Sequence, residues 1–293
     1  MKFRTEFTPV PAGFSLNPEK PVILLGSCFA DNITQRMRFC RWDAKNPFGV
    51  LFNPLSIARA VTLSLADTDP RQEILDSTFE IDGICHSWLF DSKKSANSSA
   101  DVAERILDSM KDFKDTMEAA EALFITFGTA WCYFLNKRED YVVANCHKQP
   151  QQLFTRRRIS VDEIAAVWIP LLEEIRRRYP QLKVIFTVSP VRHLKDGFTE
   201  NARSKATLIL AVEKICDSLE YCSYFPAYEI VNDDLRDYRF YASDLAHPSE
   251  MAVDYIWDIF KATYVDERKE TARMIHSTVS APTRRSQHRN IIN

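Results

Sequence analysis

Three compact apolar runs set the strongest limit on the fold of this sequence. They cover residues 21–26, 122–127 and 183–188, and a shorter candidate lies near Tyr224 and Phe225. Long segments with the 3.6-residue apolar period of amphipathic helices separate them. Short apolar strands that alternate with such helices are typical of a parallel sheet covered on both faces. The sequence therefore predicts an α/β fold: a three-layer α/β/α sandwich with a mainly parallel sheet.

The periodic segments predict helices, and one segment predicts a hairpin. Residues 77–90 hold two β-rich stretches around Asp82-Gly83, a strong signal for a two-residue hairpin turn. We expect this hairpin to be inserted between the first two sheet strands, joined by residues 131–135 and 141–144 in a small antiparallel layer. The helices are expected at about 29–40, 54–66, 99–118, 160–179, 200–219 and 249–263.

Length and composition limit the classes of protein to be considered. A chain of 293 residues with 45% apolar content can bury a large core, so we expect one domain over residues 1–265 and a polar, mobile tail over 266–293. A formal net charge of −2 supplies no field to gather nucleic acid or an anionic membrane. Seven cysteines without framework spacing, no signal peptide and no long apolar run favour a cytoplasmic location. Nothing in the composition defines an oligomeric state.

The first apolar run leads into a candidate nucleophile. The run stops at Gly26, which permits a sharp turn before a helix that begins near Phe29. Ser27 and Cys28 then lie between the carboxyl end of a strand and a helix N-terminus, where backbone N–H groups and the helix dipole favour negative charge. Either side chain could therefore attack an electrophile.

A candidate acid and base precede the last helix. Asp244 and His247 are three residues apart in one loop, so their side chains can form a hydrogen bond. Such a carboxylate fixes the imidazole tautomer for general-base work. Each half alone is also typical of an ordinary loop, but the order nucleophile, acid, base in strand-to-helix loops indicates a hydrolytic site.

These motifs resemble a known family. The block at 26–30, Gly-Ser-Cys-Phe-Ala, resembles the signature of the GSCFA-domain family, a branch of the SGNH/GDSL hydrolase superfamily. Blocks at 46–54, 143–148, 188–192 and 235–241 extend the likeness over roughly residues 20–260. The resemblance implies an SGNH-hydrolase or flavodoxin-like fold, no cofactor, and an ester-cleaving or acyl-transferring ancestry.

The register of this resemblance leaves the nucleophile open. The superfamily carries Gly-Asp-Ser-Leu with the serine as nucleophile, and that serine falls on Cys28, while the aspartate falls on Ser27. A thiol near a helix N-terminus can have its pKa lowered and act beside a histidine. Ser27 would act by the familiar chemistry of esterases.

The resemblance also implies an oxyanion hole built from the nucleophile's N–H, a glycine and an asparagine. Gly49 would be the glycine, and Gly128 opens the block in which Ala130 replaces the asparagine. Asn53 or Asn145 would then have to supply the missing donor. Losing one donor costs about 10²–10³ in rate, so an unfilled gap predicts a poor enzyme.

Other residues in family-like blocks are candidates for substrate binding. They are His147, Arg192 and Arg236, and an arginine can hold a carboxylate or a phosphate. His193, which follows the strand 183–188 together with Arg192, is also expected at the carboxyl edge of the sheet. Nearby acids offer Arg236 equally good structural partners. The histidines and cysteines could in number form a zinc site, but no C-x₂-C or H-x₃-H pair exists, so no metal is predicted.

The sequence thus favours a hydrolase or acyltransferase acting on a small-molecule ester, such as an acylated saccharide. Cys28 or Ser27 would attack the carbonyl, His247 would take the proton, and Asp244 would orient His247. The alternative is a catalytically silent protein that binds a saccharide or an acylated ligand. The Asp244/His247 pair favours the enzyme, and Ala130 favours the binding protein.

Overall fold

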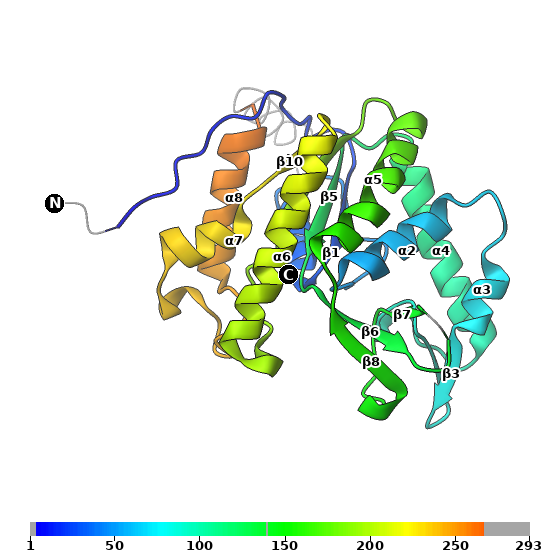
Figure 1. Ribbon diagram of the computed structural model, residues 1–293. Helices are drawn as coiled ribbons and strands as arrows, with labels where there is room; N and C mark the ends of the chain where they lie inside the picture. The colour runs from blue at the N-terminus through cyan, green and yellow to red at the C-terminus, as the bar shows by residue number, and fades with distance from the viewer. Residues whose placement is uncertain (1–3, 139, 267–293) are drawn as a thin grey trace, which may run out of the picture.

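The computed structural model describes residues 4–138 and 140–266, with a five-stranded parallel sheet at its centre (Figure 1). The strand order is β10-β9-β5-β1-β2. The strands are β1 (Val22–Gly26), β2 (Ala44–Lys45), β5 (Ala122–Phe127), β9 (Lys183–Val188) and β10 (Cys222–Tyr224). The predicted parallel sheet is confirmed. All but the first residue of the predicted tail 266–293 lies outside the described residues.

The order of the strands creates a crevice at the centre of the sheet. From β1 the chain moves to β2 on one side and then to β5 on the other, so the direction of winding reverses between β1 and β5. In open α/β sheets, ligands bind at such a switch point, beyond the carboxyl ends of the strands. The nucleophile half of the predicted site follows β1 at this edge, whereas the Asp244/His247 half lies in the loop between a short helical turn at Tyr238–Phe240 and the helix Glu250–Tyr264.

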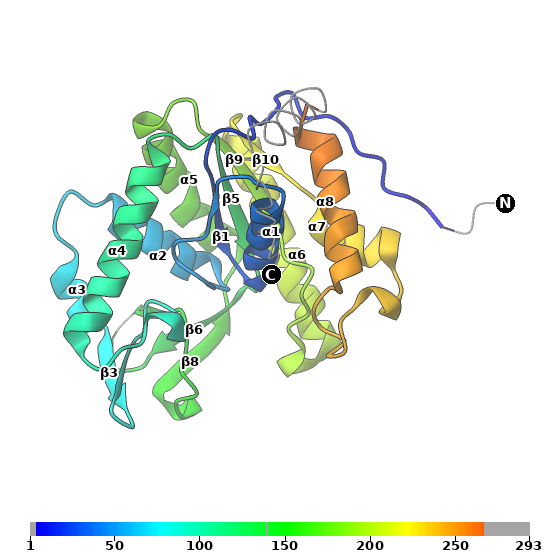
Figure 2. The ribbon, with the colours of Figure 1, turned by 180° about the vertical axis from the view of Figure 1, so that it is seen from behind.

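Helices cover both faces of the sheet, which confirms the three layers. In β1, Val22 and Leu24 pack with α1 and α8, while Ile23 and Leu25 pack with α2, α4, α5 and α6. Figure 1 shows α5 and α6 in front of the sheet, and Figure 2 shows α1 in front of the opposite face. Because both faces are buried, the strands are apolar throughout instead of alternating. The helices are α1 (Cys28–Phe39), α2 (Pro54–Leu65), α3 (Arg71–Asp76), α4 (Ser99–Met117), α5 (Val161–Arg178), α6 (Gly197–Ser218), α7 (Ala227–Glu229), a π-helical turn η4 (Ile230–Leu235) and α8 (Glu250–Tyr264).

Two small antiparallel sheets lie at one end of the molecule in both views (Figures 1 and 2). The hairpin of β3 (Thr78–Ile81) and β4 (Ile84–Ser87) turns at Asp82 and Gly83, both with positive φ, as predicted. The expectation that it joins the later strands in one layer is wrong. Its neighbours form a separate sheet, β7-β6-β8, of β6 (Trp131–Leu135), β7 (Val142–Val143) and β8 (Phe154–Arg158).

The described part of the chain contains no helix whose length and apolar character would suit it to cross a membrane.

Candidate active site

The turn after β1 requires glycine. Gly26 has a φ of 127°, and a Cβ built on it would lie 2.1 Å from the carbonyl oxygen of Thr126 in β5. Ser27 follows as the N-cap of α1, and its Oγ accepts a hydrogen bond of 3.3 Å from the Phe29 N–H. Ser27 is fully buried, so its hydroxyl is committed to the helix terminus.

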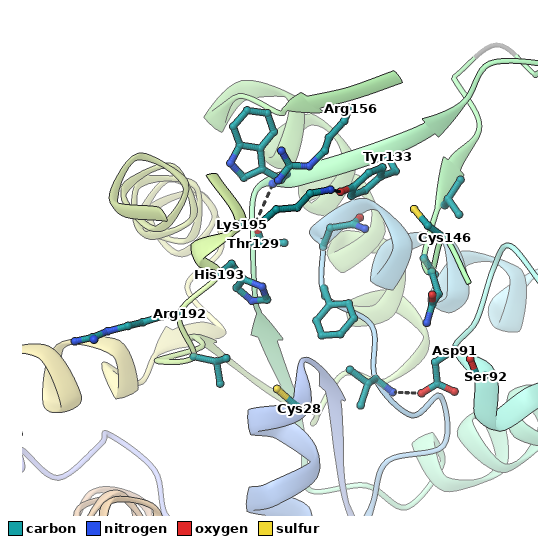
Figure 3. A pocket seen from close by; sticks show the side chains of 18 of the residues that line it. Cys28, Asp91, Ser92, Thr129, Tyr133, Cys146, Arg156, Arg192, His193 and Lys195 are labelled. Atoms are coloured by element: carbon teal, nitrogen blue, oxygen red, sulfur yellow. Dashed lines mark hydrogen bonds between the residues drawn. The ribbon is translucent and has the colours of Figure 1, made fainter. Parts of the chain in front are cut away.

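Cys28, the first residue of α1, lines a cavity of about 830 Å³ beyond the carboxyl edge of the sheet (Figure 3). Burial raises the pKa of its thiol. The backbone N–H groups of Cys28 and Phe29 and the ammonium of Lys205 act in the opposite direction. The sulfur therefore lies where an anion is stabilised by hydrogen bonds and charge, but is poorly solvated.

Asp244 and His247 form the expected pair. His247 Nδ1 lies 2.6 Å from Asp244 Oδ2, and Asp244 Oδ1 accepts the N–H groups of Ala246 and His247, each at 3.0 Å. These hydrogen bonds lower the pKa of Asp244 to about 2. With its Nδ1 proton held by the carboxylate, His247 keeps the lone pair on Nε2. His247 lines the same cavity as Cys28.

The loop after β5 uses its backbone N–H groups for structure. Gly128 and Thr129 donate to the Phe52 carbonyl at 2.8 and 3.1 Å, and Ala130 donates to Ser204 Oγ at 2.8 Å. A Cβ on Gly128 would lie 2.9 Å from the Phe52 oxygen and 3.2 Å from Ser27 Cβ, so this loop packs directly against the nucleophile turn. The N–H of Gly128, a predicted oxyanion donor, is thus already bonded.

The other predicted oxyanion residues have structural contacts of their own. Gly49 has a φ of 69° and would meet Asp91 with any side chain. Asn53 caps α2 by accepting the Ser56 N–H at 2.8 Å, and Asn145 accepts the His147 N–H at 2.8 Å. Asn53 and Asn145 nevertheless line the cavity, and Gly49 is not among its lining residues.

The three predicted substrate-binding residues lie in three different surroundings. His147 is buried, with Nε2 2.9 Å from the Ser87 carbonyl oxygen, and burial lowers its pKa. Arg192 borders the cavity, but its side chain points away from the centre (Figure 3), with its guanidinium 4.0 Å from the centre of the Tyr241 ring. Arg236 lines a separate cavity of about 80 Å³, beside Arg192.

Two further residues belong to this region: His193, which was expected at the carboxyl edge of the sheet, and Lys205, which was not predicted as a site residue. His193 lines the cavity, and its buried Nε2 has no hydrogen-bond partner among the described residues. Burial, with the charges of Lys205 and His247, lowers the pKa of His193 to about 4. Lys205 is fully buried, and its Nζ donates to the carbonyl oxygens of Gly128 and Ser189, each at 2.6 Å.

The only sequence signal for these contacts is a polar set on one face of α6. Asn201, Ser204 and Lys205 occur at spacings of three and four residues, on the face that continues with buried Leu208. Asn201 accepts the His193 N–H at 2.9 Å. The polar face of α6, defined as Asn201, Ser204 and Lys205, therefore fastens the loops after β5 and β9.

The far wall of the cavity combines aromatic rings with cations (Figure 3). The Arg156 guanidinium lies 4.2 Å from the centre of the Trp131 ring and pairs with Asp196, and Lys195 Nζ donates to Tyr133 Oη at 2.9 Å. The aromatic surfaces are thus partly covered by positive groups. No group of three or more His, Cys, Asp or Glu side chains arranged to hold a metal ion occurs within 4–138 and 140–266.

The structure defines a doubly wound α/β protein whose switch-point cavity holds a thiol and a carboxylate-paired imidazole. The chain belongs to the GSCFA family, which its sequence matches over residues 21–260. A comparison with curated proteins finds none that matches.

Solved structures give weaker likenesses. An acetyl xylan esterase from Butyrivibrio proteoclasticus has a TM-score of 0.42 at 13% identity, covering 93% of this chain and 67% of its own. A Streptococcus pneumonia protein described provisionally as a platelet activating factor has a TM-score of 0.40 at 10% identity, covering 83% and 82%. A carbohydrate esterase of family 3 from Talaromyces cellulolyticus has a TM-score of 0.32 at 10% identity, covering 90% and 100%. These likenesses are too distant to carry an inference about the reaction.

Proposed function

We propose that this GSCFA-family protein is an ester hydrolase or acyltransferase with Cys28 as its nucleophile. One observation carries the proposal: Cys28 and His247 line one cavity, and Asp244 holds His247 Nδ1 at 2.6 Å. This is the set of roles that a nucleophile, a general base and an orienting carboxylate require.

The reaction begins when His247 Nε2 takes the proton of the Cys28 thiol. The thiolate attacks the ester carbonyl carbon, and the oxyanion that forms is stabilised at the N-terminus of α1. The tetrahedral intermediate expels the alcohol, which receives the proton from His247, and leaves a thioester on Cys28. Water or an acceptor hydroxyl, deprotonated by His247, then attacks the thioester and releases Cys28.

Burial and hydrogen bonding favour Cys28 over Ser27 in this role. Ser27 is fully buried and its hydroxyl accepts the Phe29 N–H, whereas Cys28 lines the cavity. Attack by Ser27 would require the cap of α1 to break first. Capping interactions of this kind are worth about 1 kcal/mol, which adds to the barrier.

The size and wall of the cavity support a small-molecule substrate. A volume of about 830 Å³ is in the range that takes a ligand of several rings or sugar units. The wall around Trp131, Tyr133 and Lys195 offers both ring surface and hydrogen-bond donors. An acylated saccharide or a comparable ester fits this combination.

A binding protein without activity is the second candidate, because Ala130 stands where an oxyanion donor is expected and the Gly128 N–H is bonded to Phe52. In that case the cavity would bind an acylated ligand without cleaving it. Both candidates predict binding, so only a covalent adduct or turnover separates them.

Covalent labelling tests the proposal. The protein is treated separately with a fluorophosphonate and with iodoacetamide at neutral pH, and the modified peptides are mapped by mass spectrometry. We expect iodoacetamide to modify Cys28 faster than Cys146, a half-buried thiol of the same cavity, and the His247→Ala variant to lose that advantage. Phosphonylation of Ser27 would instead identify a serine esterase. No preference at either residue would favour the binding protein.

A further inference from the structure

Lys205 has surroundings that are unusual for a lysine. Its side chain is among the largest that are fully buried, and no carboxylate among the described residues pairs with it. Its ammonium has only the carbonyl oxygens of Gly128 and Ser189 as hydrogen-bond partners in the described structure. An unpaired buried charge opposes folding, and such groups concentrate at functional sites.

The two carbonyls connect Lys205 to the nucleophile turn. Gly128 follows β5 and packs against Ser27, since a Cβ on Gly128 would lie 3.2 Å from Ser27 Cβ. Ser27 precedes Cys28, and the charges of Lys205 and Cys28 act on each other. Lys205 thus lies behind the loop that packs against the nucleophile turn, and is not among the described residues that line the cavity.

The other charged or titratable groups around this pair are few. On α1, Asp31 disfavours a Cys28 thiolate. From the cavity side, the charges of Lys205 and His247 both act on His193, and burial keeps His193 neutral near pH 7. The Tyr228 ring lies 5.9 Å from Lys205 Nζ and carries no charge near that pH. Lys205 is therefore the interior group whose charged form favours a thiolate at the sulfur.

We propose that Lys205 is a positioning residue whose buried ammonium stabilises the thiolate of Cys28. This inference rests on the proposed role of Cys28 as nucleophile. The hydrogen bonds to Gly128 and Ser189 hold the ammonium in place without neutralising it, so its charge remains available to the sulfur. The α1 N-terminus contributes from one side and Lys205 from the other.

Burial disfavours the charged form of both groups: it raises the pKa of Cys28 and lowers the pKa of Lys205 to about 7, while each charged form favours the other. Lys205 is therefore charged in about half of the molecules at pH 7. A nearby opposite charge shifts a pKa by about one unit or more, so removing the charge at Lys205 should lower the thiolate population at pH 7 about fivefold.

The test measures the rate of Cys28 alkylation by iodoacetamide from pH 6 to pH 10, by peptide mapping, in the wild type and in Lys205→Met and Lys205→Gln. Glutamine keeps donors for the two carbonyls but removes the charge. Lys214→Met is the control, because Lys214 is an exposed lysine of the same helix that pairs with Asp162 at 2.6 Å. We expect both Lys205 variants to slow alkylation at pH 7 about fivefold and the control to leave the pH profile unchanged. The difference from the wild type should disappear above pH 9, where Lys205 has lost its proton.

Each outcome decides the question. A wild-type rate at pH 7 in Lys205→Gln would mean that hydrogen bonding, and not charge, is the contribution of Lys205, and would overturn the proposal. If neither variant folds, the wild type decides: its alkylation rate must rise less steeply above pH 7 than below it, because Lys205 loses its charge with a pKa of about 7, and a uniform rise would overturn the proposal. The labelling test of the proposed function compares Cys28 with Cys146 in the wild type, so a slow Cys28 in that test is distinct from unchanged rates in the Lys205 variants.

Discussion

At the scale of single residues, both carboxylate oxygens of Asp244 accept hydrogen bonds from one short loop. One oxygen binds two backbone N–H groups and the other binds His247. The carboxylate therefore fixes both the loop and the imidazole. With its pKa lowered to about 2, it stays charged throughout the pH range in which His247 could act as a base.

Replacing Asp244 by asparagine should separate the two roles. The amide oxygen can still accept the backbone N–H groups, but the NH₂ group would face His247 and favour the wrong tautomer. We expect ester turnover to fall by about 10³–10⁴-fold with the fold retained, as measured by kcat and circular dichroism. Asp237→Asn is the control, because Asp237 is an exposed carboxylate of the same region that pairs with Arg239. Equal turnover in both variants would contradict the proposed role.

Gly26 offers a test of the turn before the nucleophile. Gly26→Ala introduces a Cβ 2.1 Å from the Thr126 oxygen at a φ of 127°, so it combines backbone strain with overlap. We expect a loss of about 3 kcal/mol or more in the free energy of unfolding, measured with urea. Gly83→Ala, at a φ of 78° with nothing within 4 Å, carries the strain alone and should cost about 1 kcal/mol. If Gly26→Ala lowers the free energy of unfolding no more than Gly83→Ala does, the backbone of β5 must move away to make room for the added Cβ.

At the scale of elements, α6 holds the site from behind. Its polar face reaches the loops after β5 and β9, while the rest of its inner face is apolar and packs on the sheet. The helix begins at Gly197, a little before the predicted residue 200. Asn201 and Ser204 therefore lie inside the helix and bond to distant loops.

Ser204→Ala should loosen the loop after β5. It removes the acceptor of the Ala130 N–H and a contact of 3.1 Å with Thr129 Oγ1, both buried. We expect the free energy of unfolding to drop by about 1–3 kcal/mol, since a buried donor is left unpaired. Thr207→Ala, on the same helix, removes a hydroxyl that bonds the Arg203 carbonyl, and should change the free energy by less than about 0.5 kcal/mol. Similar values for both would indicate that the loop is held by other contacts.

The elements with clear periodicity were predictable, and short or charged ones were not. The sheet strands β1, β5 and β9, the hairpin and the long helices follow from apolar patterns in the sequence. β8 carries Arg156, Arg157 and Arg158 in succession, and these charges hide its alternation. β2 has two residues, too few for any period, and α3 has six. The partners that order them lie elsewhere in the chain.

At the scale of the molecule, the site brings together the turn after β1, the loops after β5 and β9, and the loop before α8. The sequence predicted Cys28, Asp244 and His247 as candidates because motifs mark them locally. It did not predict Lys205, whose hydrogen bond to Gly128 spans 77 residues, since lysine is rarely buried and only the packed sheet brings the two together. No contact of the Ala130 side chain with the described residues explains why alanine stands where an asparagine is expected.

The stability of the whole molecule should depend on pH through His193. Burial lowers its pKa to about 4 from an ordinary 6.5, so between these values the unfolded chain binds the proton and the folded one does not. Stability should therefore rise with pH over this window and be lost on acidification. From pH 6.5 to pH 5 the loss attributable to His193 is about 2 kcal/mol. Urea unfolding at both pH values should show this dependence in the wild type, and His193→Gln should flatten it; an unchanged slope in the variant would exclude His193 as its source.

The cavity wall comes from segments inserted between the elements of the central sheet. Residues 91–93 lie between α2 and α4, and residues 131–156 lie between β5 and α5. Neither insertion contributes a strand to the five-stranded sheet. Evolution can therefore lengthen, shorten or exchange these segments among relatives while the turn that carries Cys28 stays the same, so family members with one chemistry can diverge in the molecules they accept.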